Sequence, residues 1–310
     1  MKIAILGTGS IGSLFAACLA QDPANEILCI VATEAHRDRI NRDGITISEA
    51  DGTEIRAEHL RALTGTEGES PADLVIVTVK SYSTRQAVHG HPELFGPDTL
   101  VLTVQNGYGN HDDIRGAVPD DHIFLGTTSH GMNIDADGII HHAGSGPTYL
   151  GPLVPEADGA AENAAAICEV LQQAGFETFV SEDINDAIYR KLLINIAINP
   201  LSALNDTTNE YVLRDAAVYH NARMLVREAI QILDMAGYHY DFDEMWEVIA
   251  GVAERTGKNV CSMLADVRNG RPTEIRRING AIVEMAGEMH VDAPQNRDIV
   301  HQIELQFGAE

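Results

Sequence analysis

Short, almost wholly apolar runs alternate with helix-like stretches through the first half of the chain. Four runs of five or six residues lie at Lys2–Leu6, Ile27–Val31, Leu74–Val79 and Leu100–Val104. Runs this apolar are typical of strands buried on both faces of a parallel sheet. A helical stretch, Ile11–Ala20, follows the first run. This alternation predicts a doubly wound α/β sheet with helices on either side.

Three further runs follow, at Ile123–Gly126, Ile139–His142 and Thr148–Gly151. We expect them to be antiparallel additions to the sheet, and we expect a helix at about Asp158–Ala174.

From about Ser181 the pattern changes to apolar residues at helical spacing, with few β-branched runs between them. The predicted helices are Ile184–Ala203, Ala216–Ala236, Phe242–Ala253 and Ile275–His290. The second part of the chain is therefore predicted to be an all-α domain. The boundary falls within Gly175–Ser181, which gives an α/β domain over residues 1–178 and a helical domain over residues 179–310.

Composition agrees with two globular domains, since the chain has 310 residues and 45% of them are hydrophobic. Lys and Arg number 21 against 46 Asp and Glu, a formal net charge of −25. Such a surface repels phosphate backbones and anionic lipids, so we expect no nucleic-acid partner and no membrane association. Adaptation to high salt is an alternative explanation of the acidity; we favour an ordinary, well-solvated acidic surface.

No apolar run approaches the roughly 18–20 residues of a membrane span, and the N-terminal run is too short for a signal peptide. The four cysteines lie far apart without a CxxC pair, which is typical of reduced thiols. We therefore expect a soluble, cytoplasmic protein.

A glycine-rich loop, Gly7-Thr8-Gly9-Ser10-Ile11-Gly12, lies between the first strand and the first helix. In this context the GxGxxG pattern allows a tight turn, a close approach of the backbone to a pyrophosphate, and close packing of helix on strand. The helix N-terminus adds N–H donors and a positive dipole. These six residues predict a dinucleotide site in a Rossmann-type domain.

Residues after the second strand discriminate between the two nicotinamide dinucleotides. An acidic residue there binds the ribose 2′-hydroxyl of NAD, whereas an arginine accepts the 2′-phosphate of NADP. Here Glu34 could bind the ribose, and Arg37 or Arg39 could bind a phosphate. On these residues both cofactors stay open.

Polar residues follow two of the buried strands at the sheet edge where doubly wound folds bind ligands. Lys80 closes the strand Leu74–Val79, and Gln105-Asn106-Gly107 follows the next strand. A strand-end lysine is often only a solvated charge. Because the chain has four lysines, we favour a functional role for Lys80.

Lys191, Asn195 and Asn199 fall at i, i+4 and i+8 of an otherwise apolar stretch, so they share one face of the predicted helix. Buried asparagines can simply bond neighbouring helices, which is a serious alternative for Asn199. That alternative is weaker for Lys191, because a desolvated lysine is costly and is commonly kept for proton transfer or charge recognition.

A third polar stretch runs from Cys261 to Ile275. Thr273-Glu274 is predicted to begin a helix that runs through Asn279-Gly280, where an acid in the first turn is also ordinary helix-start chemistry.

Taken together, these motifs resemble the ketopantoate reductase family (2-dehydropantoate 2-reductases) over almost the whole chain. The matching segments, in order, are the glycine loop, Val79-Lys80, Gln105-Asn106-Gly107, Gly126-Thr127-Thr128-Ser129-His130, the Lys191–Asn199 helix, Ser262-Met263 with Asp266, and Thr273-Glu274-Ile275 with Asn279-Gly280. The resemblance implies reduction of 2-dehydropantoate to (R)-pantoate by hydride transfer from NAD(P)H, a step of pantothenate and CoA biosynthesis.

The resemblance also implies roles for single residues. Lys191 would be the general acid, and Glu274 a second polar anchor near that lysine and the substrate. Asn195, Asn199 and Ser262 would bind the substrate's carboxylate and hydroxyl groups. Asn106 and Lys80 would lie where cofactor and substrate meet, and Met132 would contact the cofactor.

The sequence departs from the family at the position after the second strand, where an arginine is associated with NADPH. Here Thr33 stands in its place and Glu34 follows. Thr33 can donate one hydrogen bond to a phosphate and Glu34 would repel it, so we place NADH slightly ahead of NADPH.

Two alternatives remain. An NADH-dependent D-2-hydroxyacid dehydrogenase would share the scaffold and act on another branched or aromatic 2-keto acid. A non-catalytic dinucleotide sensor would have no need of Lys191. A homodimer through the helical domain is compatible with the composition.

Metal chemistry has little support, because His141-His142 and the pair His89 and His91 lack ligand spacing with a partner cluster. We expect His130 to support the cleft rather than to catalyse.

Overall fold

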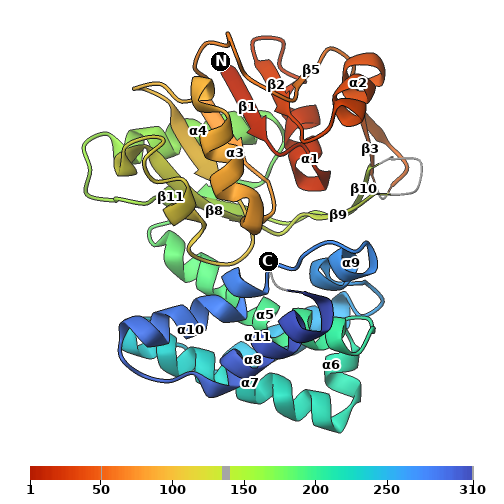
Figure 1. Cartoon of the computed structure of the whole chain (residues 1–310), viewed down its shortest axis with the longest axis vertical. Helices are drawn as coiled ribbons and strands as arrows, with labels where there is room; N and C mark the ends of the chain where they lie inside the picture. Colours follow the sequence, from red (N-terminus) through yellow and green to blue (C-terminus); the bar gives the residue numbers. More distant parts are fainter. Residues whose placement is uncertain (50, 135–139, 309–310) are drawn as a thin grey trace. The chain divides into compact units, whose positions relative to one another are not determined.

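In the computed structural model, which describes residues 1–49, 51–134 and 140–308, the first apolar runs form the centre of an eight-stranded sheet (Figure 1). Its order is β12-β11-β8-β7-β6-β1-β2-β5. The strands are β1 (Lys2–Leu6), β2 (Glu26–Ile30), β5 (Arg61–Leu63), β6 (Leu74–Val77), β7 (Leu100–Thr103), β8 (Ile123–Thr128), β11 (Thr148–Pro152) and β12 (Thr178–Val180). All neighbours are parallel except β8 and β11. The predicted parallel sheet is confirmed.

The three runs predicted as antiparallel additions have different places. β8 is parallel to β7 and antiparallel only to β11, so it continues the parallel sheet. Most of the run Ile139–His142 belongs to β10 (Ile140–Gly144), which lies in a second sheet; residue 139 itself falls outside the described residues. Placing that run in the main sheet was therefore wrong, because its partners are β3 and β9.

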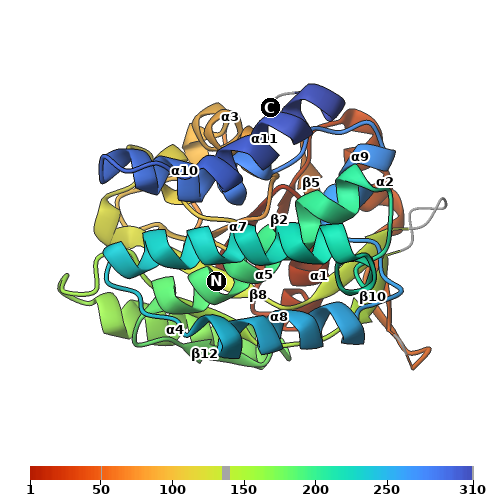
Figure 2. The ribbon, with the colours of Figure 1, turned by 90° about the horizontal axis from the view of Figure 1, so that it is seen from below.

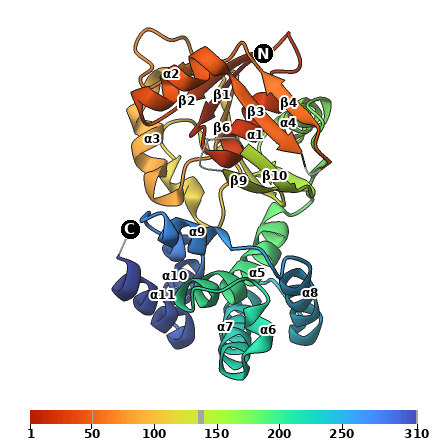
Figure 3. The same cartoon turned by 90° about the vertical axis from the view of Figure 1, so that its right-hand side faces the viewer.

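The second sheet has the order β4-β3-β10-β9 (Figure 3). Its other strands are β3 (Ile45–Glu49), β4 (Glu54–Ala57) and β9 (Gly131–Ile134). Helix α1 (Ser10–Leu19) contacts β1 and β2 on one side and β3, β4 and β9 on the other, so it lies between the two sheets. Eight consecutive residues of α1 are buried, as a helix covered on both sides requires.

The remaining helices of this α/β unit are α2 (Glu34–Asp43), α3 (Thr84–Gly90) and α4 (Ala160–Gln173), with short 3-10 turns at Ser81–Ser83, Pro92–Leu94, Asn110–Asp113 and Asp120–His122. The predicted helix at Asp158–Ala174 corresponds to α4 within two residues at each end.

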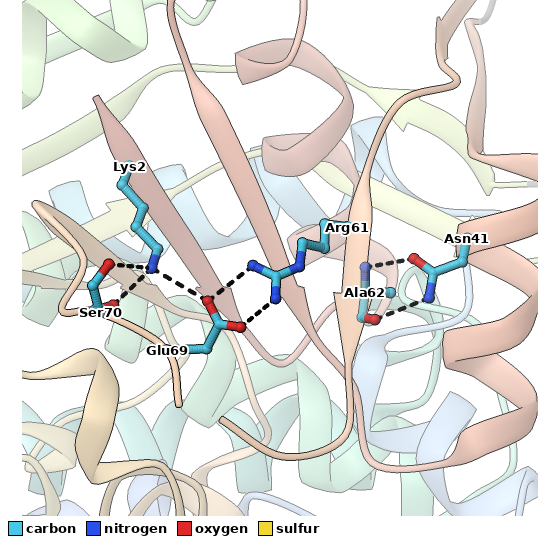
Figure 4. Close-up of polar contacts among 6 residues, drawn as sticks. All are labelled: Lys2, Asn41, Arg61, Ala62, Glu69 and Ser70. Carbon is cyan, nitrogen blue, oxygen red and sulfur yellow. Dashed lines mark hydrogen bonds and ion pairs between the residues drawn. The ribbon is translucent and has the colours of Figure 1, made fainter. Parts of the chain in front are cut away.

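The amino ends of the parallel strands are held by polar contacts (Figure 4). Lys2 Nζ donates to the carbonyl and hydroxyl oxygens of Ser70 at 2.7 and 2.9 Å and pairs with Glu69 at 3.4 Å. Glu69 also pairs with Arg61 on the edge strand β5. On the same edge strand, β5, the Asn41 side-chain amide donates to Ala62 O at 3.0 Å and accepts from Ala62 N at 2.7 Å. This amide occupies the position of a further strand, which protects the edge.

The second half of the chain is helical, as predicted. Its helices are α5 (Ile184–Leu204), α6 (Tyr211–Arg214), α7 (Ala216–Met235), α8 (Phe242–Arg255), α9 (Ser262–Arg268), α10 (Asn279–Glu288) and α11 (Pro294–Phe307). Helix α7 packs against α8, α10 and α11 (Figure 2). Asp215 and Asp241 cap the N-termini of α7 and α8 by accepting backbone N–H groups.

One predicted helix is divided. Ile275–His290 begins with a 3-10 turn at Ile275–Arg277, and α10 starts only at Asn279. The residue between, Ile278, has φ −103° and ψ −93°, which is not helical and ends the first segment. The prediction that Thr273-Glu274 begins one continuous helix was therefore wrong.

The chain divides into two compact units, residues 1–105 with 110–184, and residues 106–109 with 185–310. The domain limits 1–178 and 179–310 stay a prediction. The structure adds that a four-residue segment in the first half of the chain belongs to the helical unit. Among the described residues, no helix combines the length and apolarity that crossing a membrane would require.

Candidate functional site

The glycine-rich loop joins β1 to α1 with contacts that explain its three glycines. Gly7 has φ +101°, and a Cβ there would lie 2.4 Å from Val79 Cγ1. A Cβ on Gly12 would lie 2.4 Å from Gly7 O and 2.6 Å from Thr78 Oγ1. Gly9, at the N-cap of α1, is exposed, and its Cβ would meet only Gly7 O at 4.0 Å. Gly7 and Gly12 therefore permit close packing, and Gly9 leaves open space at the helix N-terminus where a pyrophosphate fits.

The other loop residues contribute differently. The Thr8 side chain is buried and its hydroxyl lies 3.3 Å from Ile30 O, so it ties the loop to β2. Ser10 and Ile11 are half-buried in the first turn of α1. Their backbone N–H groups belong to the donors that a helix N-terminus offers to an anion.

After β2, Thr33 and Glu34 begin α2. The Thr33 hydroxyl accepts the backbone N–H of His36 at 3.3 Å, so it serves as the N-cap of α2. The Glu34 side chain is 80% exposed and lies 3.6 Å from Arg37. This end of β2 therefore presents an accessible carboxylate, and the threonine hydroxyl accepts a helix N–H with an oxygen whose own O–H can still donate.

Lys80 lies beyond the strand rather than at its end. β6 ends at Val77, and Lys80 is the N-cap of the 3-10 turn Ser81–Ser83, so the prediction that Lys80 closes the strand was wrong. Gln105 fixes this turn, because its Nε2 donates to Val79 O at 2.7 Å and to Thr84 Oγ1 at 2.8 Å. The ends of β6 and β7 are thus tied together at the carboxyl edge of the sheet.

In the helical unit, α5 carries Lys191, Asn195 and Asn199 along one face, as predicted. Lys191 and Asn195 are half-buried and Asn199 is buried. Five of the intervening residues are buried in the helical core, and Ile194 is partly buried against it; the five are Leu192, Leu193, Ile196, Ala197 and Ile198.

The ammonium of Lys191 is surrounded by protein, although the side chain as a whole is only half-buried. Desolvation lowers the pKa of Lys191 to about 8, and the negative charge of Glu274 opposes that shift. Such a lysine changes protonation state near physiological pH, as a proton donor and acceptor must.

Glu274 is buried and precedes the 3-10 turn, whose Arg277 N and Ile278 N both donate to Glu274 O, at 3.1 and 3.2 Å. This tight turn fixes the backbone that presents the carboxylate. It also explains why the α10 helix starts late.

Ser262 is exposed at the first turn of α9. The residue before it, Cys261, caps α9 by accepting Leu264 N at 3.4 Å and donates its thiol to Asn199 O at 3.6 Å. The start of α9 is thereby fixed against the polar face of α5. Sequence reasoning did not assign Cys261 this role.

The segment Asn106–Gly109 packs on the helical unit. Tyr108 N donates to Arg277 O at 2.8 Å, and the rings of Tyr108 and Tyr189 lie 5.0 Å apart. Gly107 has φ +84°, and a Cβ there would lie 2.1 Å from Arg277 O. Asn106 is therefore held next to the backbone that follows Glu274. Sequence reasoning missed Tyr108, although its flanking glycines signal a close backbone approach.

Met132 lies on β9 of the α/β unit, where it pairs with His142 of β10 and its half-buried side chain packs against the core of that unit. The predicted site residues thus form two sets. The helical unit holds Lys191, Asn195, Asn199, Ser262, Glu274 and Asn106, and the α/β unit holds the glycine loop, Thr33, Glu34, Lys80 and Met132. Within residues 1–49, 51–134 and 140–308, no group of three or more His, Cys, Asp or Glu side chains has the arrangement of a metal site.

Two family models match the chain in succession. "Ketopantoate reductase PanE/ApbA" matches residues 3–155, and "Ketopantoate reductase PanE/ApbA C terminal" matches residues 183–306. The 2-dehydropantoate 2-reductase of Pyrococcus abyssi is 33% identical over 299 residues, covering 96% of this chain and 94% of the relative. That of Halobacterium salinarum is 31% identical over 305 residues, covering 98% of both.

Among solved structures, D-mandelate dehydrogenase in a ternary complex with NADH and anilino(oxo)acetate matches with a TM-score of 0.90 and 28% identity over 100% of both chains. The family models and the archaeal relatives agree over nearly the full length. This chain belongs to the ketopantoate reductase family.

Proposed function

We propose that this protein reduces 2-dehydropantoate (ketopantoate) to (R)-pantoate with a nicotinamide dinucleotide, and that Lys191 is the general acid. The observation that carries the proposal is a lysine whose pKa is lowered to about 8 by burial, opposed by a buried glutamate, on a helix face that also carries two asparagines. Membership of the ketopantoate reductase family supports the choice of substrate.

The reaction needs a cation at the carbonyl oxygen. A bound reduced nicotinamide supplies a hydride to the carbonyl carbon, and negative charge then builds on the oxygen. The Lys191 ammonium stabilises that charge and gives its proton to the oxygen, which leaves a neutral amine that solvent reprotonates. Glu274 favours the charged lysine through its own negative charge. Glu274 therefore helps to keep Lys191 protonated before the reaction.

The substrate is a carboxylate that must bind a chain of net charge −25. Asn195, Asn199 and Ser262 offer amide and hydroxyl groups on α5 and at the start of α9, and Asn106 adds an amide from the segment held against Arg277. These neutral amide and hydroxyl groups can donate hydrogen bonds that orient the keto acid, and they add no further charge beside the Lys191 ammonium. This arrangement supports assigning these four residues to substrate binding.

The glycine loop with Ser10 and Ile11 would hold the pyrophosphate, Lys80, Asn106 and Met132 would lie near the nicotinamide end, and Thr33 and Glu34 near the adenosine ribose. We place NADH ahead of NADPH. Thr33 can donate only one hydrogen bond to a phosphate, and the exposed Glu34 carboxylate favours a ribose hydroxyl over a phosphate.

Initial rates test the proposal. Purified protein is assayed with 2-dehydropantoate and either NADH or NADPH, beside a panel of branched and aromatic 2-keto acids. We expect the highest kcat/KM with 2-dehydropantoate. The match to D-mandelate dehydrogenase is the reason for the aromatic members of the panel. Turnover of an aromatic keto acid without turnover of 2-dehydropantoate would contradict the substrate and retain the chemistry.

Two further assignments belong to the proposal. A homodimer would have a mass of 2 × 33.5 = 67 kDa, which light scattering distinguishes from the 33.5 kDa chain. A cytoplasmic location is supported by four buried cysteines, none of which forms a disulfide.

A further inference from the structure

Two histidines and a glutamate form a hydrogen-bonded chain in the α/β unit, apart from the residues assigned to the reaction. His142 Nδ1 lies 2.8 and 3.0 Å from the two carboxylate oxygens of Glu49, and His142 Nε2 lies 2.8 Å from His130 Nδ1. His142 is buried, and His130 and Glu49 are half-buried. The three residues come from β10, from the turn between β8 and β9, and from β3.

A carboxylate accepts hydrogen bonds and donates none, so His142 must carry a proton on Nδ1. In neutral His142 the other nitrogen, Nε2, then accepts, and His130 must donate from Nδ1. Glu49 therefore determines which nitrogen of His130 is protonated, through an intervening ring. One added proton is compatible with the chain: His142 then donates at both nitrogens and His130 accepts at Nδ1. A second added proton would set two N–H groups against each other.

His130 is also held on its other side. Its ring meets the edge of Phe176 at 5.3 Å, and Phe176 stacks on Phe15 of α1 at 4.7 Å. Cys18 of α1 also lies near this hydrogen-bonded chain. Burial raises the pKa of the Cys18 thiol, and the negative charge of Glu49 raises it further. The ring of His130 is thus fixed between the second sheet and the helix that begins at the glycine loop.

The turn that carries His130 lies at the ligand edge of the main sheet. β8 is parallel to β7, β6 and β1 in succession, so its carboxyl end and that of β1 lie at the same edge. Thr128 accepts from Thr148 Oγ1 at 2.9 Å, and Ser129 N donates to Pro147 O at 3.1 Å. Two residues after His130 comes Met132, which the proposed function assigns to the cofactor.

We propose that Glu49, His142 and His130 form a relay that positions the turn 128–132 for the dinucleotide, with His130 held as its Nδ1–H tautomer. The three are positioning residues. The inference rests on the proposed function only where it assigns Met132 to the cofactor. Cofactor binding would then depend on the Glu49 carboxylate, which reaches the turn through the rings of His142 and His130.

The test combines a spectroscopic readout with cofactor binding. A long-range 1H–15N correlation spectrum of 15N-histidine-labelled protein reports which ring nitrogen is protonated, and His130→Asn and His142→Asn assign two of the 13 histidines. We expect His130 to be the Nδ1–H tautomer in the native chain. Glu49→Leu removes both carboxylate oxygens, so His142 is no longer required to carry its proton on Nδ1 and the His130 tautomer should change. Glu49→Gln keeps an amide oxygen that can still accept from His142 Nδ1, so it should preserve the native tautomer.

NADH binding is followed by nicotinamide fluorescence, without substrate. We expect the dissociation constant to rise about tenfold in His142→Asn and about threefold in Glu49→Leu, because a charge-assisted hydrogen bond is lost. In turnover, KM for NADH should rise with kcat at saturating NADH nearly unchanged. Glu54→Leu, on the neighbouring strand β4 and outside the hydrogen-bonded chain, is the matched control and should change neither readout.

A tautomer of His130 that is unchanged in Glu49→Leu would overturn the relay. A changed tautomer with unchanged NADH affinity would overturn the positioning role. Neither readout needs turnover, so a failure of the native protein to reduce any 2-keto acid would overturn the proposed function and leave this test intact.

Discussion

Two lysines in different regions of the molecule show how surroundings decide what the same side chain does. Lys2, at the amino end of β1, has three oxygen acceptors from Ser70 and Glu69 within 3.4 Å (Figure 4). Glu69 is in turn held by Arg61, whose hydrogen bond is the main reason that the pKa of this carboxyl lies below its usual range. At Lys191 desolvation outweighs the attraction of Glu274, and the pKa falls to about 8.

The two lysines differ in how far protein groups replace the water around the ammonium. Around Lys2, a carboxylate, a carbonyl and a hydroxyl oxygen accept hydrogen bonds from the ammonium, so this side chain ties neighbouring segments of the sheet together. Around Lys191, the apolar core of α5 leaves the charge less stabilised than in water, so the lysine releases its proton readily. The contacts of Lys2 therefore hold the amino end of the sheet together, whereas Lys191 on α5 changes protonation state near neutral pH, as the proposed general acid must.

The largest expected effect comes from removing the proton donor. Lys191→Ala should lower kcat by about 10³-fold, within the range for loss of a general acid, and leave the NADH dissociation constant within about twofold. Lys191→Arg keeps a cation but holds its proton too tightly to donate, so it should remain slow. Steady-state rates and fluorescence titration measure both. Lys258→Ala, at an exposed lysine of the same unit, is the control. Full activity of Lys191→Ala would support the sensor alternative.

Removal of the opposing charge should have the next largest effect. In Glu274→Gln the attraction that raises the pKa of Lys191 is gone, so that pKa should fall further below about 8. Less of the acid is then protonated at neutral pH, and kcat should fall about 10- to 100-fold. The pH profile of kcat should shift to lower pH. An unshifted profile would contradict the coupling of the two groups.

The native enzyme should show a pH dependence of definite sign. Reduction needs the protonated lysine, so kcat should be level below pH about 8 and fall about tenfold per pH unit above it. Oxidation of the hydroxy acid needs the neutral amine, so its rate should rise with pH through the same range. Stopped-flow measurement in both directions checks this, and parallel profiles in the two directions would exclude Lys191 as the shared group.

A smaller effect is expected at the cofactor end. Glu34→Ala removes an exposed negative charge, which should raise kcat/KM for NADPH relative to NADH about two- to fivefold. Competition assays with both cofactors measure the ratio. Asp38→Ala removes another exposed carboxylate of α2 and should change the ratio less. The preference for NADH loses its basis if the ratio stays constant in Glu34→Ala.

The smallest effect on activity should come from the other lysine. Lys2→Met should leave kcat within about twofold and destabilise the α/β unit by about 1–2 kcal/mol, because Glu69 and Ser70 lose a donor. Thermal unfolding measured on both variants sharpens the contrast. Lys2→Met should lower Tm without loss of rate, whereas Lys191→Ala should lower the rate without lowering Tm. A large loss of rate in Lys2→Met would erase the distinction between the two regions.

Much of the architecture was predictable from the chain. The strands β1, β2, β6 and β7 are buried except at the first residue of β1, β2 and β7, so their apolar runs were visible without any structure. The polar face of α5 was visible for the opposite reason, since three polar residues at a spacing of four interrupt an apolar helix. The second sheet was largely missed, although Ile45–Ser48 and Glu54–Ala57 alternate apolar and polar residues, because alternation over only four residues is a weak signal beside the wholly apolar runs of the main sheet.

The sequence by itself determined the parallel sheet, the glycine loop, the helical second half and the face of Lys191, because each depends on local pattern and burial. Tertiary structure alone decided that Tyr108 carries Asn106 into the helical unit, that Cys261 joins α9 to Asn199, and that Glu49 reaches His130 through His142. It also decided which groups surround the ammonium groups of Lys2 and Lys191. Solvation, electrostatic attraction and tautomer depend on which groups from distant parts of the chain surround an atom, and those neighbours exist only in the folded protein.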